Sequence, residues 1–267
     1  MDQVHPVAAA GFSAAADVYE RARPSYPTEA IDWLARRVDL REGRTVVDVG
    51  AGTGKLTRLL VPTGAHVVAV EPLPAMLERL VEAAPGAGAI LGTAEELPLP
   101  DASADVITVA QAMHWFDQAR ALPEFRRVLR PGGAVALVWN SRDLDDRLQA
   151  ELGRVLEPVR KRVPAQVDNA WREPFERSPL FGPLDVFRVP FAQLFTVEEL
   201  CDRVSSTSFV AALPSEERGE LLASVRALVD GVPEPFQFRY VTEIFVASAA
   251  DEAAADRGAD RGARHRR

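Results

Sequence analysis

The sequence lacks the features that would place it in a membrane or an oxidising compartment. Cys201 is the only cysteine, so a disulfide within the chain is excluded. No run of about 18 apolar residues occurs, which predicts that the chain does not span a membrane. The N-terminus has no basic segment followed by an apolar one, so no secretory signal is expected. Together these absences favour a cytoplasmic protein.

Positive charge is scarce as well, with 31 Lys and Arg against 39 Asp and Glu and a net charge of −8. Nucleic-acid-binding proteins usually present a basic face, so we expect no nucleic-acid partner. The 4 histidines and the single cysteine form no cluster with metal-ligand spacing, so we expect no metal site. The sequence gives no indication of oligomeric state.

What the chain does contain is a stretch, 45–54, around which the rest is organised. Residues 45–49 are rich in β-branched side chains, which is typical of a buried parallel strand. Gly50, Gly52 and Gly54 follow at alternate positions, and a helical pattern begins directly after them. A strand, a glycine turn and a helix bring backbone N–H groups and a helix N-terminus close to a ligand.

The spacing of these glycines separates three ligand classes. A dinucleotide fingerprint would require glycine at position 55, which is Lys55. A phosphate-binding P-loop would require glycine at 49 and Ser or Thr at 56, which are Val49 and Leu56. The turn therefore matches neither phosphate-binding motif, and a tight glycine-rich turn that binds no ligand is the alternative to a binding site.

Strand and helix patterns alternate from 45 to 140, which predicts a parallel sheet with helices on both faces. Amphipathic helices and two further strand candidates follow. The predicted strands cover residues 45–49, 66–71, 89–92, 104–110, 134–139, 186–195 and 236–247. The predicted helices after residue 140 cover residues 143–163, 196–205 and 215–230, with an irregular loop at 164–183.

Glu71 ends the second predicted strand, 21 residues after Gly50. This matches the offset of about 20 residues expected of a ribose-binding acid in Rossmann-like units. A carboxylate can accept hydrogen bonds from both hydroxyls of a ribose. The alternative is a solvated glutamate at a strand end.

The pattern Asp-x-Gly-x-Gly-x-Gly at 48–54, followed by Glu71, resembles the first motifs of class I S-adenosylmethionine (SAM)-dependent methyltransferases. The resemblance extends over about residues 12–247. It implies an α/β fold, a Rossmann-like SAM methyltransferase sheet with helices on both faces and a mainly helical cap. It also implies a closing antiparallel hairpin, SAM as methyl donor and S-adenosylhomocysteine as product.

The N-terminal pattern Phe-x6-Tyr-x3-Arg-Pro-x-Tyr-Pro at 12–27 resembles that of small-molecule methyltransferases of the trans-aconitate type, where it is a lid over the SAM pocket. The alternative is a helix pair packed on the domain. Within the lid, Arg23 suits the methionine carboxylate of SAM. The implied division is a lid (1–40), a SAM-binding core (41–141), cap helices with the sixth strand (142–235), the final strand (236–248) and a disordered tail (249–267).

A third motif resembling the family's adenine-binding segment follows the third strand. There, Glu95 has a solvated helix start as its alternative, and Met76 on the preceding helix has core packing as its alternative. The implied cofactor-binding residues are Tyr19, Arg23, Asp48, Gly50, Ala51, Gly52, Thr53, Gly54, Glu71, Pro72, Met76, Thr93, Ala94, Glu95 and Gln111.

The acceptor should lie near 111–117, because ligands in open α/β sheets bind beyond the carboxyl ends of the strands. His114 is the titratable group there with a near-neutral pKa in its free form, so it is the candidate catalytic base; the alternative is a structural histidine. If the cap folds over the site, Trp171 and Phe175 would give an apolar acceptor cavity. We expect methylation of a small organic molecule, on a carboxylate or hydroxyl oxygen. N- or C-methylation of a secondary metabolite, or SAM binding without catalysis, are the alternatives.

Overall fold

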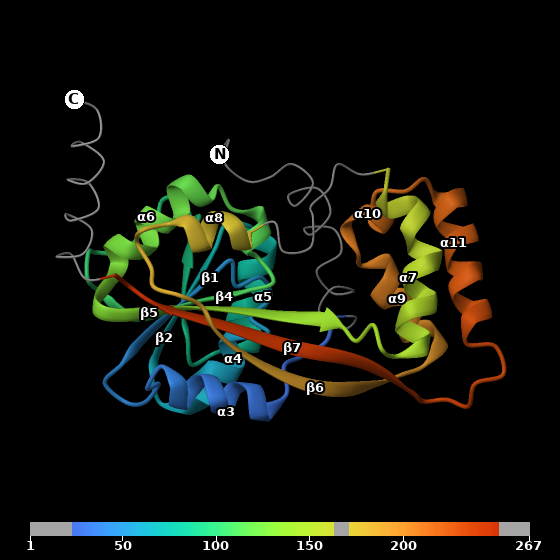
Figure 1. The fold of residues 1–267 in the computed structure, drawn as a ribbon, viewed down its shortest axis with the longest axis horizontal. Coiled ribbons are helices and arrows are strands. Elements are labelled where there is room, and N and C mark those ends of the chain that lie inside the picture. Colours follow the sequence, from blue (N-terminus) through green and yellow to red (C-terminus); the bar gives the residue numbers. More distant parts are fainter. Residues whose placement is uncertain (1–22, 163–170, 251–267) are drawn as a thin grey trace.

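A seven-stranded sheet forms the centre of the computed structural model, which describes residues 23–162 and 171–250 (Figure 1). The strand order is β3-β2-β1-β4-β5-β7-β6. Neighbouring strands from β3 to β5 are parallel, and β7 is antiparallel to both β5 and β6. The strands are β1 (Thr45–Val49), β2 (His66–Glu71), β3 (Gly88–Leu91), β4 (Ala104–Ala110), β5 (Leu129–Arg142), β6 (Asp185–Phe195) and β7 (Phe236–Ser248).

Helices cover both faces of this sheet, as predicted (Figure 1). One face packs against α6 and α8, and the other against α3 and α4. The central strands β1 and β4 are therefore buried on both sides, which explains their continuous apolar runs. The helices of this part are α3 (Thr28–Arg37), α4 (Thr57–Leu60), α5 (Pro74–Ala83), α6 (Gln118–Val128) and α8 (Arg172–Arg177).

Several elements differ from the sequence-based prediction, among them a helix at Ser208–Ala211 that the sequence does not predict and a helix at Arg147–Arg160 where it predicts 143–163. Strand β5 begins at Leu129 rather than 134, because Leu129 already pairs with Ala104. The next pair joins Val106 to Ala134, and this register shift accommodates the proline and two glycines that lie between Leu129 and Ala134. Helix α8 forms within a stretch predicted to be an irregular loop. It holds Phe175, and Trp171 directly precedes it; both are almost fully buried in the sheet core rather than under the cap.

The cap is carried by the far ends of β6 and β7. Pairing of β6 with β7 continues to Phe195 and Phe236, beyond the last β5–β7 pair, Arg142 with Tyr240. Four helices pack on this extension with a separate apolar core (Figure 1). They are α7 (Arg147–Arg160), α9 (Val197–Ser205), α10 (Ser208–Ala211) and α11 (Ser215–Leu228).

Local capping explains where two of the cap helices, α7 and α9, start. Thr196 precedes α9 and accepts a hydrogen bond from the Glu199 backbone N–H, while the Glu199 carboxylate accepts from the Thr196 N–H. This reciprocal capping box confirms the predicted start of the helix. Asp146 plays the simpler form of the same role for α7, accepting from the Gln149 N–H.

The end of the described chain is packed rather than free. The Ala249 N–H donates to the Gly133 carbonyl at 2.8 Å, and the Ala250 N–H donates to the Leu180 carbonyl at 2.9 Å. The predicted tail therefore starts at least two residues too early, and its remainder lies outside the described residues. Within 23–162 and 171–250, no helix has the length and apolar character needed to cross a bilayer.

Candidate active site

The glycine turn follows β1 at the carboxyl edge of the sheet. Gly50, Gly52 and Gly54 have φ values of +66°, +58° and +82°, which side chains with a Cβ rarely adopt. A Cβ at Gly50 would lie 2.8 Å from the Ala112 Cβ, and one at Gly54 would lie 3.0 Å from the Leu80 Cγ. A Cβ at Gly52 would meet nothing within 4 Å. Gly50 and Gly54 thus serve close packing, and Gly52 faces open space.

Asp48 lies beneath this turn and is fully buried. Its two carboxylate oxygens accept hydrogen bonds from the hydroxyls of Thr57, at 2.6 Å, and Thr108, at 2.9 Å. Burial raises the pKa of Asp48 to about 6, although both hydroxyl bonds oppose the rise. Asp48 therefore ties β1 to α4 and β4, and it supports the turn from below.

Glu71 ends β2 beside the turn and is 5% exposed, so the structure excludes a solvated glutamate. Its Oε2 accepts from the Gly52 N–H at 2.8 Å, and its Oε1 accepts from the Leu73 N–H at 3.0 Å. Burial raises the pKa of Glu71 to about 7, against these two bonds, and the charge of Asp48 adds to the rise. The carboxylate is thus incompletely compensated, and each oxygen retains capacity for another donor.

These features fit the ribose end of SAM. A ribose diol supplies two hydroxyl donors, which would stabilise the ionised form of a buried carboxylate such as Glu71. The neighbouring predicted residues line the same edge: Ala51 donates its N–H to the Val70 carbonyl at 3.2 Å, Thr53 is buried, and Pro72 is half-buried. Their contacts with the cofactor stay a prediction.

The predicted adenine segment is a tight loop after β3. Thr93 and Glu96 form an isolated antiparallel bridge, and Ala94 between them is 3% exposed. The Glu95 Oε1 accepts from the Asp117 N–H at 2.9 Å, so Glu95 is joined to the start of α6 rather than left in solvent. Met76 on α5 is 3% exposed, in keeping with the core-packing alternative.

Gln111 and His114 follow β4 at the neighbouring position of the same edge. Gln111 is a non-glycine residue with a φ of +58°, a strained conformation that clusters at functional sites. The His114 ring lies 4.6 Å from the Trp115 ring and 5.4 Å from the Trp139 ring, centroid to centroid. His114 therefore lies among aromatic side chains at the ends of β4 and β5.

Residues 23–27 connect this edge to the cap. The Asn140 Nδ2 donates to the Ser25 carbonyl at 3.0 Å, and the Asn140 Oδ1 accepts from the Thr242 hydroxyl at 2.6 Å. The Arg23 Nη2 donates to the Ser206 carbonyl at the end of α9, at 2.9 Å. Arg23 is thus engaged with the cap, and its role toward the methionine carboxylate stays a prediction. Tyr19 lies outside the described residues.

Sequence reasoning missed the partners that hold these groups, namely Thr57, Thr108 and Asn140. Thr108 offered a signal, because it is a hydroxyl within the buried run of β4 and required a polar partner. Thr57 and Asn140 gave none, since their partners are known only once the strands are placed.

The aromatic residues expected in an acceptor cavity occupy the core instead. The Trp171 ring stacks on Trp139 with centroids 5.8 Å apart and meets Phe245 edge-on at 5.1 Å. Phe175 packs edge-on against Trp171 at 6.5 Å. The prediction that Trp171 and Phe175 line a cavity under the cap is wrong, because α8 packs against the sheet.

An antiparallel final strand inserted between β5 and β6, and a glycine turn that meets a buried acid, are the arrangement that the resemblance to class I SAM-dependent methyltransferases implies. Comparison with known proteins agrees. Residues 47–137 match the family model described as a methyltransferase domain. An uncharacterized methyltransferase of Mycobacterium tuberculosis is 46% identical over 222 residues, covering 82% of this chain and 85% of that protein. The chain therefore belongs to the methyltransferase family, and it is a SAM-dependent enzyme.

Two further proteins are similar to this chain, one of them a solved structure and the other an O-methyltransferase. A solved structure from Anaeromyxobacter dehalogenans, assigned to the type II methyltransferases, has a TM-score of 0.67 and 28% identity, covering 85% of this chain and 97% of that one. A malonyl-[acyl-carrier protein] O-methyltransferase of Dechloromonas aromatica is 38% identical over 129 residues, covering 45% of this chain and 47% of that protein.

Removal of the Glu71 carboxylate is expected to weaken SAM binding by roughly ten- to a hundredfold. A hydrogen bond to a charged group contributes about 1–3 kcal/mol, which corresponds to that range of affinity. Calorimetric titration of Glu71→Ala with SAM measures the loss. Glu71→Gln, which keeps the volume and one acceptor oxygen, should lie between Ala and the wild type. A loss below about twofold in the Ala variant contradicts ribose binding by Glu71.

The affinity for SAM should also rise with pH. Ribose hydroxyls donate more strongly to a carboxylate than to a carboxylic acid, and the pKa of Glu71 in the free protein is raised to about 7. If binding lowers this pKa, SAM should bind about tenfold more weakly at about pH 6 than at about pH 8. Glu71→Gln should flatten the dependence. An equally steep dependence in that variant would assign it to another group.

Proposed function

We propose that this enzyme transfers the methyl group of SAM to an oxygen atom, carboxylate or hydroxyl, of a small organic molecule. The observation that carries the proposal is the position of His114, an imidazole just beyond the end of β4 whose ring lies 4.6 Å from the Trp115 ring and 5.4 Å from the Trp139 ring. The acidic composition, with a net charge of −8, favours a small acceptor over a nucleic acid. The similarity to an O-methyltransferase of D. aromatica also supports oxygen as the acceptor atom.

In this proposal the carboxyl edge of the sheet holds SAM. Glu71 and Pro72 would meet the ribose, and Met76 with Thr93, Ala94 and Glu95 would meet the adenine. Most of the remaining predicted residues would hold the methionine part: Tyr19, Arg23, Gly50, Ala51, Gly52, Thr53, Gly54 and Gln111. Asp48, which is fully buried beneath the turn, would act on the site by holding the turn in shape. We propose residues 1–40 as a lid and the helices within 142–235 as a cap over the acceptor.

Methyl transfer from SAM requires the protein mainly to position the two reactants and to exclude water. Bound SAM supplies a methyl group that its sulfonium charge already activates for in-line displacement. The aromatic rings around His114 would exclude water and orient the acceptor, and these are the main contributions available to such an enzyme. A base is needed only where the acceptor oxygen still carries a proton, and in this proposal His114 takes that proton.

A screen for SAM consumption tests the proposal. The enzyme is incubated with SAM and a panel of small carboxylic acids, phenols, alcohols and amines, and formation of S-adenosylhomocysteine is followed. We expect turnover with members of the first three classes and an O-methyl product by mass spectrometry. Efficient methylation of RNA or protein, with no turnover across the panel, would overturn the small-molecule proposal. Methylation of nitrogen or carbon alone would overturn the choice of oxygen.

A further inference from the structure

Residues 92–101, which make up most of the loop between β3 and β4, fold back on themselves. A Cβ on Gly92 would lie 2.7 Å from the Pro98 Cδ, so the two ends of the turn are in close contact. The Leu99 N–H donates to the Leu97 carbonyl at 2.8 Å. This loop begins with the residues proposed to meet the adenine of SAM, so its backbone position matters for the cofactor site.

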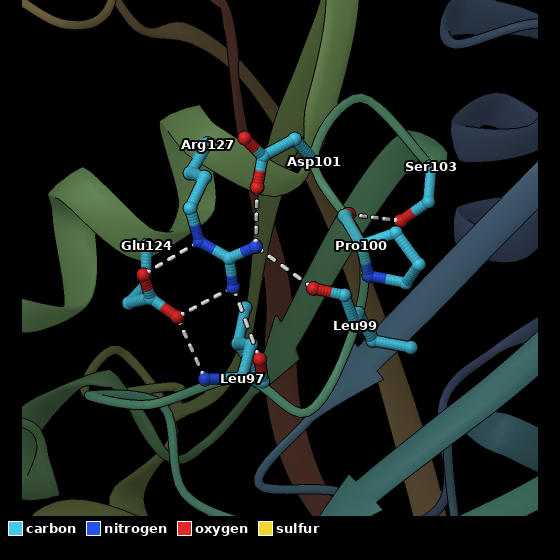
Figure 2. A network of polar contacts seen from close by, with 7 residues as sticks. All are labelled: Leu97, Leu99, Pro100, Asp101, Ser103, Glu124 and Arg127. Atoms are coloured by element: carbon cyan, nitrogen blue, oxygen red, sulfur yellow. Dashed lines mark hydrogen bonds and ion pairs between the residues drawn. The ribbon is translucent and has the colours of Figure 1, made fainter.

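Arg127 on α6 forms hydrogen bonds with the C-terminal half of this loop (Figure 2). Its Nη1 donates to the Leu99 carbonyl and to the Asp101 Oδ1, both at 2.8 Å. Its Nη2 donates to the Leu97 carbonyl at 3.0 Å and to the Glu124 Oε2 at 2.7 Å, and its Nε donates to the Glu124 Oε1 at 2.8 Å. Since a guanidinium has five N–H donors, every donor of Arg127 has an acceptor.

Glu124, on the same helix, binds both Arg127 and the loop (Figure 2). Its Oε2 accepts from the Leu97 N–H at 2.8 Å, so both backbone polar groups of Leu97 are bound by the pair. The hydrogen bond from Arg127 lowers the pKa of Glu124, which keeps it ionised. The Arg127 and Glu124 side chains are 32% and 20% exposed, so water screens this bidentate pair less than an ordinary surface ion pair.

The first half of the loop is joined to the other end of α6. The Glu95 carboxylate accepts from the Asp117 N–H, and Asp117 caps α6 by accepting from the Ala119 N–H at 3.1 Å. Both ends of one helix therefore fix the segment between β3 and β4. The same helix follows the 111–117 segment that carries His114, so α6 connects the adenine side of the site to the acceptor side.

We propose that Arg127 and Glu124 are positioning residues for adenine recognition. They do not contact the cofactor; they set the backbone of 92–101 so that Thr93, Ala94 and Glu95 present a fixed surface to the base. This inference rests on the proposed adenine role of those three residues. A rigid surface selects between bases that differ by one polar group, because a mismatch leaves a buried donor or acceptor unpaired.

The test compares two ligands that differ only in the base. Calorimetry measures S-adenosylhomocysteine and S-inosylhomocysteine, which has a carbonyl in place of the adenine amino group. We expect the wild type to prefer the adenine form. Arg127→Met should bind S-adenosylhomocysteine about tenfold more weakly than the wild type does, while its affinity for S-inosylhomocysteine should change less. The ratio of the two affinities should therefore be smaller in Arg127→Met than in the wild type. Glu124→Gln and Asp101→Asn should follow in the same direction with smaller effects.

Arg120→Met is the matched control. Arg120 lies on α6, is exposed, and makes no ion pair with the described residues. Its removal should leave both affinities unchanged. If Arg127→Met does not fold, the ratio of the affinities for S-adenosylhomocysteine and S-inosylhomocysteine in Glu124→Gln and Asp101→Asn tests the inference instead.

Two results overturn the inference. In the first, folded variants keep the wild-type preference and lose only thermal stability, which makes the contacts structural. In the second, the wild type binds S-adenosylhomocysteine without preferring adenine, which removes the loop from base recognition. Failure of the wild type to bind S-adenosylhomocysteine would instead remove the cofactor site on which the inference rests. No acceptor is present in these titrations, so the O-methylation proposal is tested separately.

Discussion

Gly52→Val is expected to remove measurable SAM binding, a loss of more than about a hundredfold, while the domain stays folded. Gly52 has a φ of +58°, and its missing Cβ faces open space on the side where the cofactor is proposed to lie. A valine there would occupy the space needed for close approach of a ligand to the backbone. The conformational strain, about 1–2 kcal/mol, is small against the 5–15 kcal/mol of a typical domain.

Gly43→Val is the matched control for that experiment. Gly43 has a φ of +83° and nothing within 4 Å of its Cβ position, so it carries the same kind of strain in equally open space. It precedes β1 and therefore lies at the opposite edge of the sheet. Calorimetry and thermal unfolding of both variants separate strain from blocked binding. Unchanged SAM affinity in Gly52→Val, or tighter binding of NAD than SAM by the wild type, would contradict the assignment.

Much of the sheet could be predicted because its signals are local. The predicted bounds of β1, β2 and β4 agree with the structure, since each is a run of apolar residues ended by glycine, proline or polar residues. The strand pattern of 66–71 placed Glu71 at the end of β2, which the structure confirms, and its offset from Gly50 predicted the ribose-binding role, which stays a prediction. The antiparallel order of the last two strands came from the family resemblance and is confirmed by their pairing.

What could not be predicted depends on contacts between distant parts of the chain. Trp171 and Phe175 are apolar in either location, and only the packing of α8 against α6 decides that they belong to the sheet core. Arg23 forms a hydrogen bond with Ser206, 183 positions further along the chain, and no local sequence pattern predicts that bond. Arg127 and Glu124 read as an ordinary pair on a helix surface until the loop from β3 is placed beside them.

Asp48 shows how a correct pattern can hide a different geometry. The sequence marks it as part of the glycine motif, but its carboxylate is fully buried against Thr57 and Thr108. A buried polar group needs such partners, and they lie on other elements, so only the fold reveals them. Its place in the motif is therefore consistent with holding the turn in shape.

His114→Ala should distinguish the two acceptor chemistries left open by the site. A hydroxyl acceptor must lose its proton, and a positioned base typically contributes about 10²–10⁴-fold to the rate, so kcat should fall by that factor. A carboxylate acceptor is already ionised, and the loss should be only a few-fold, through the packing that His114 provides against Trp115 and Trp139. The rates are measured with the substrate found in the screen and with SAM saturating.

The control for that variant is His66→Ala, which removes an exposed imidazole at the start of β2, on the opposite edge of the sheet. It should leave kcat unchanged with either acceptor. The pH dependence adds a readout that packing alone would not move. If His114 is the base, kcat of the wild type with a hydroxyl acceptor should rise with pH, and this rise should disappear in His114→Ala. A hydroxyl substrate whose turnover falls less than about twofold in His114→Ala, with its pH profile intact, would leave His114 a structural residue.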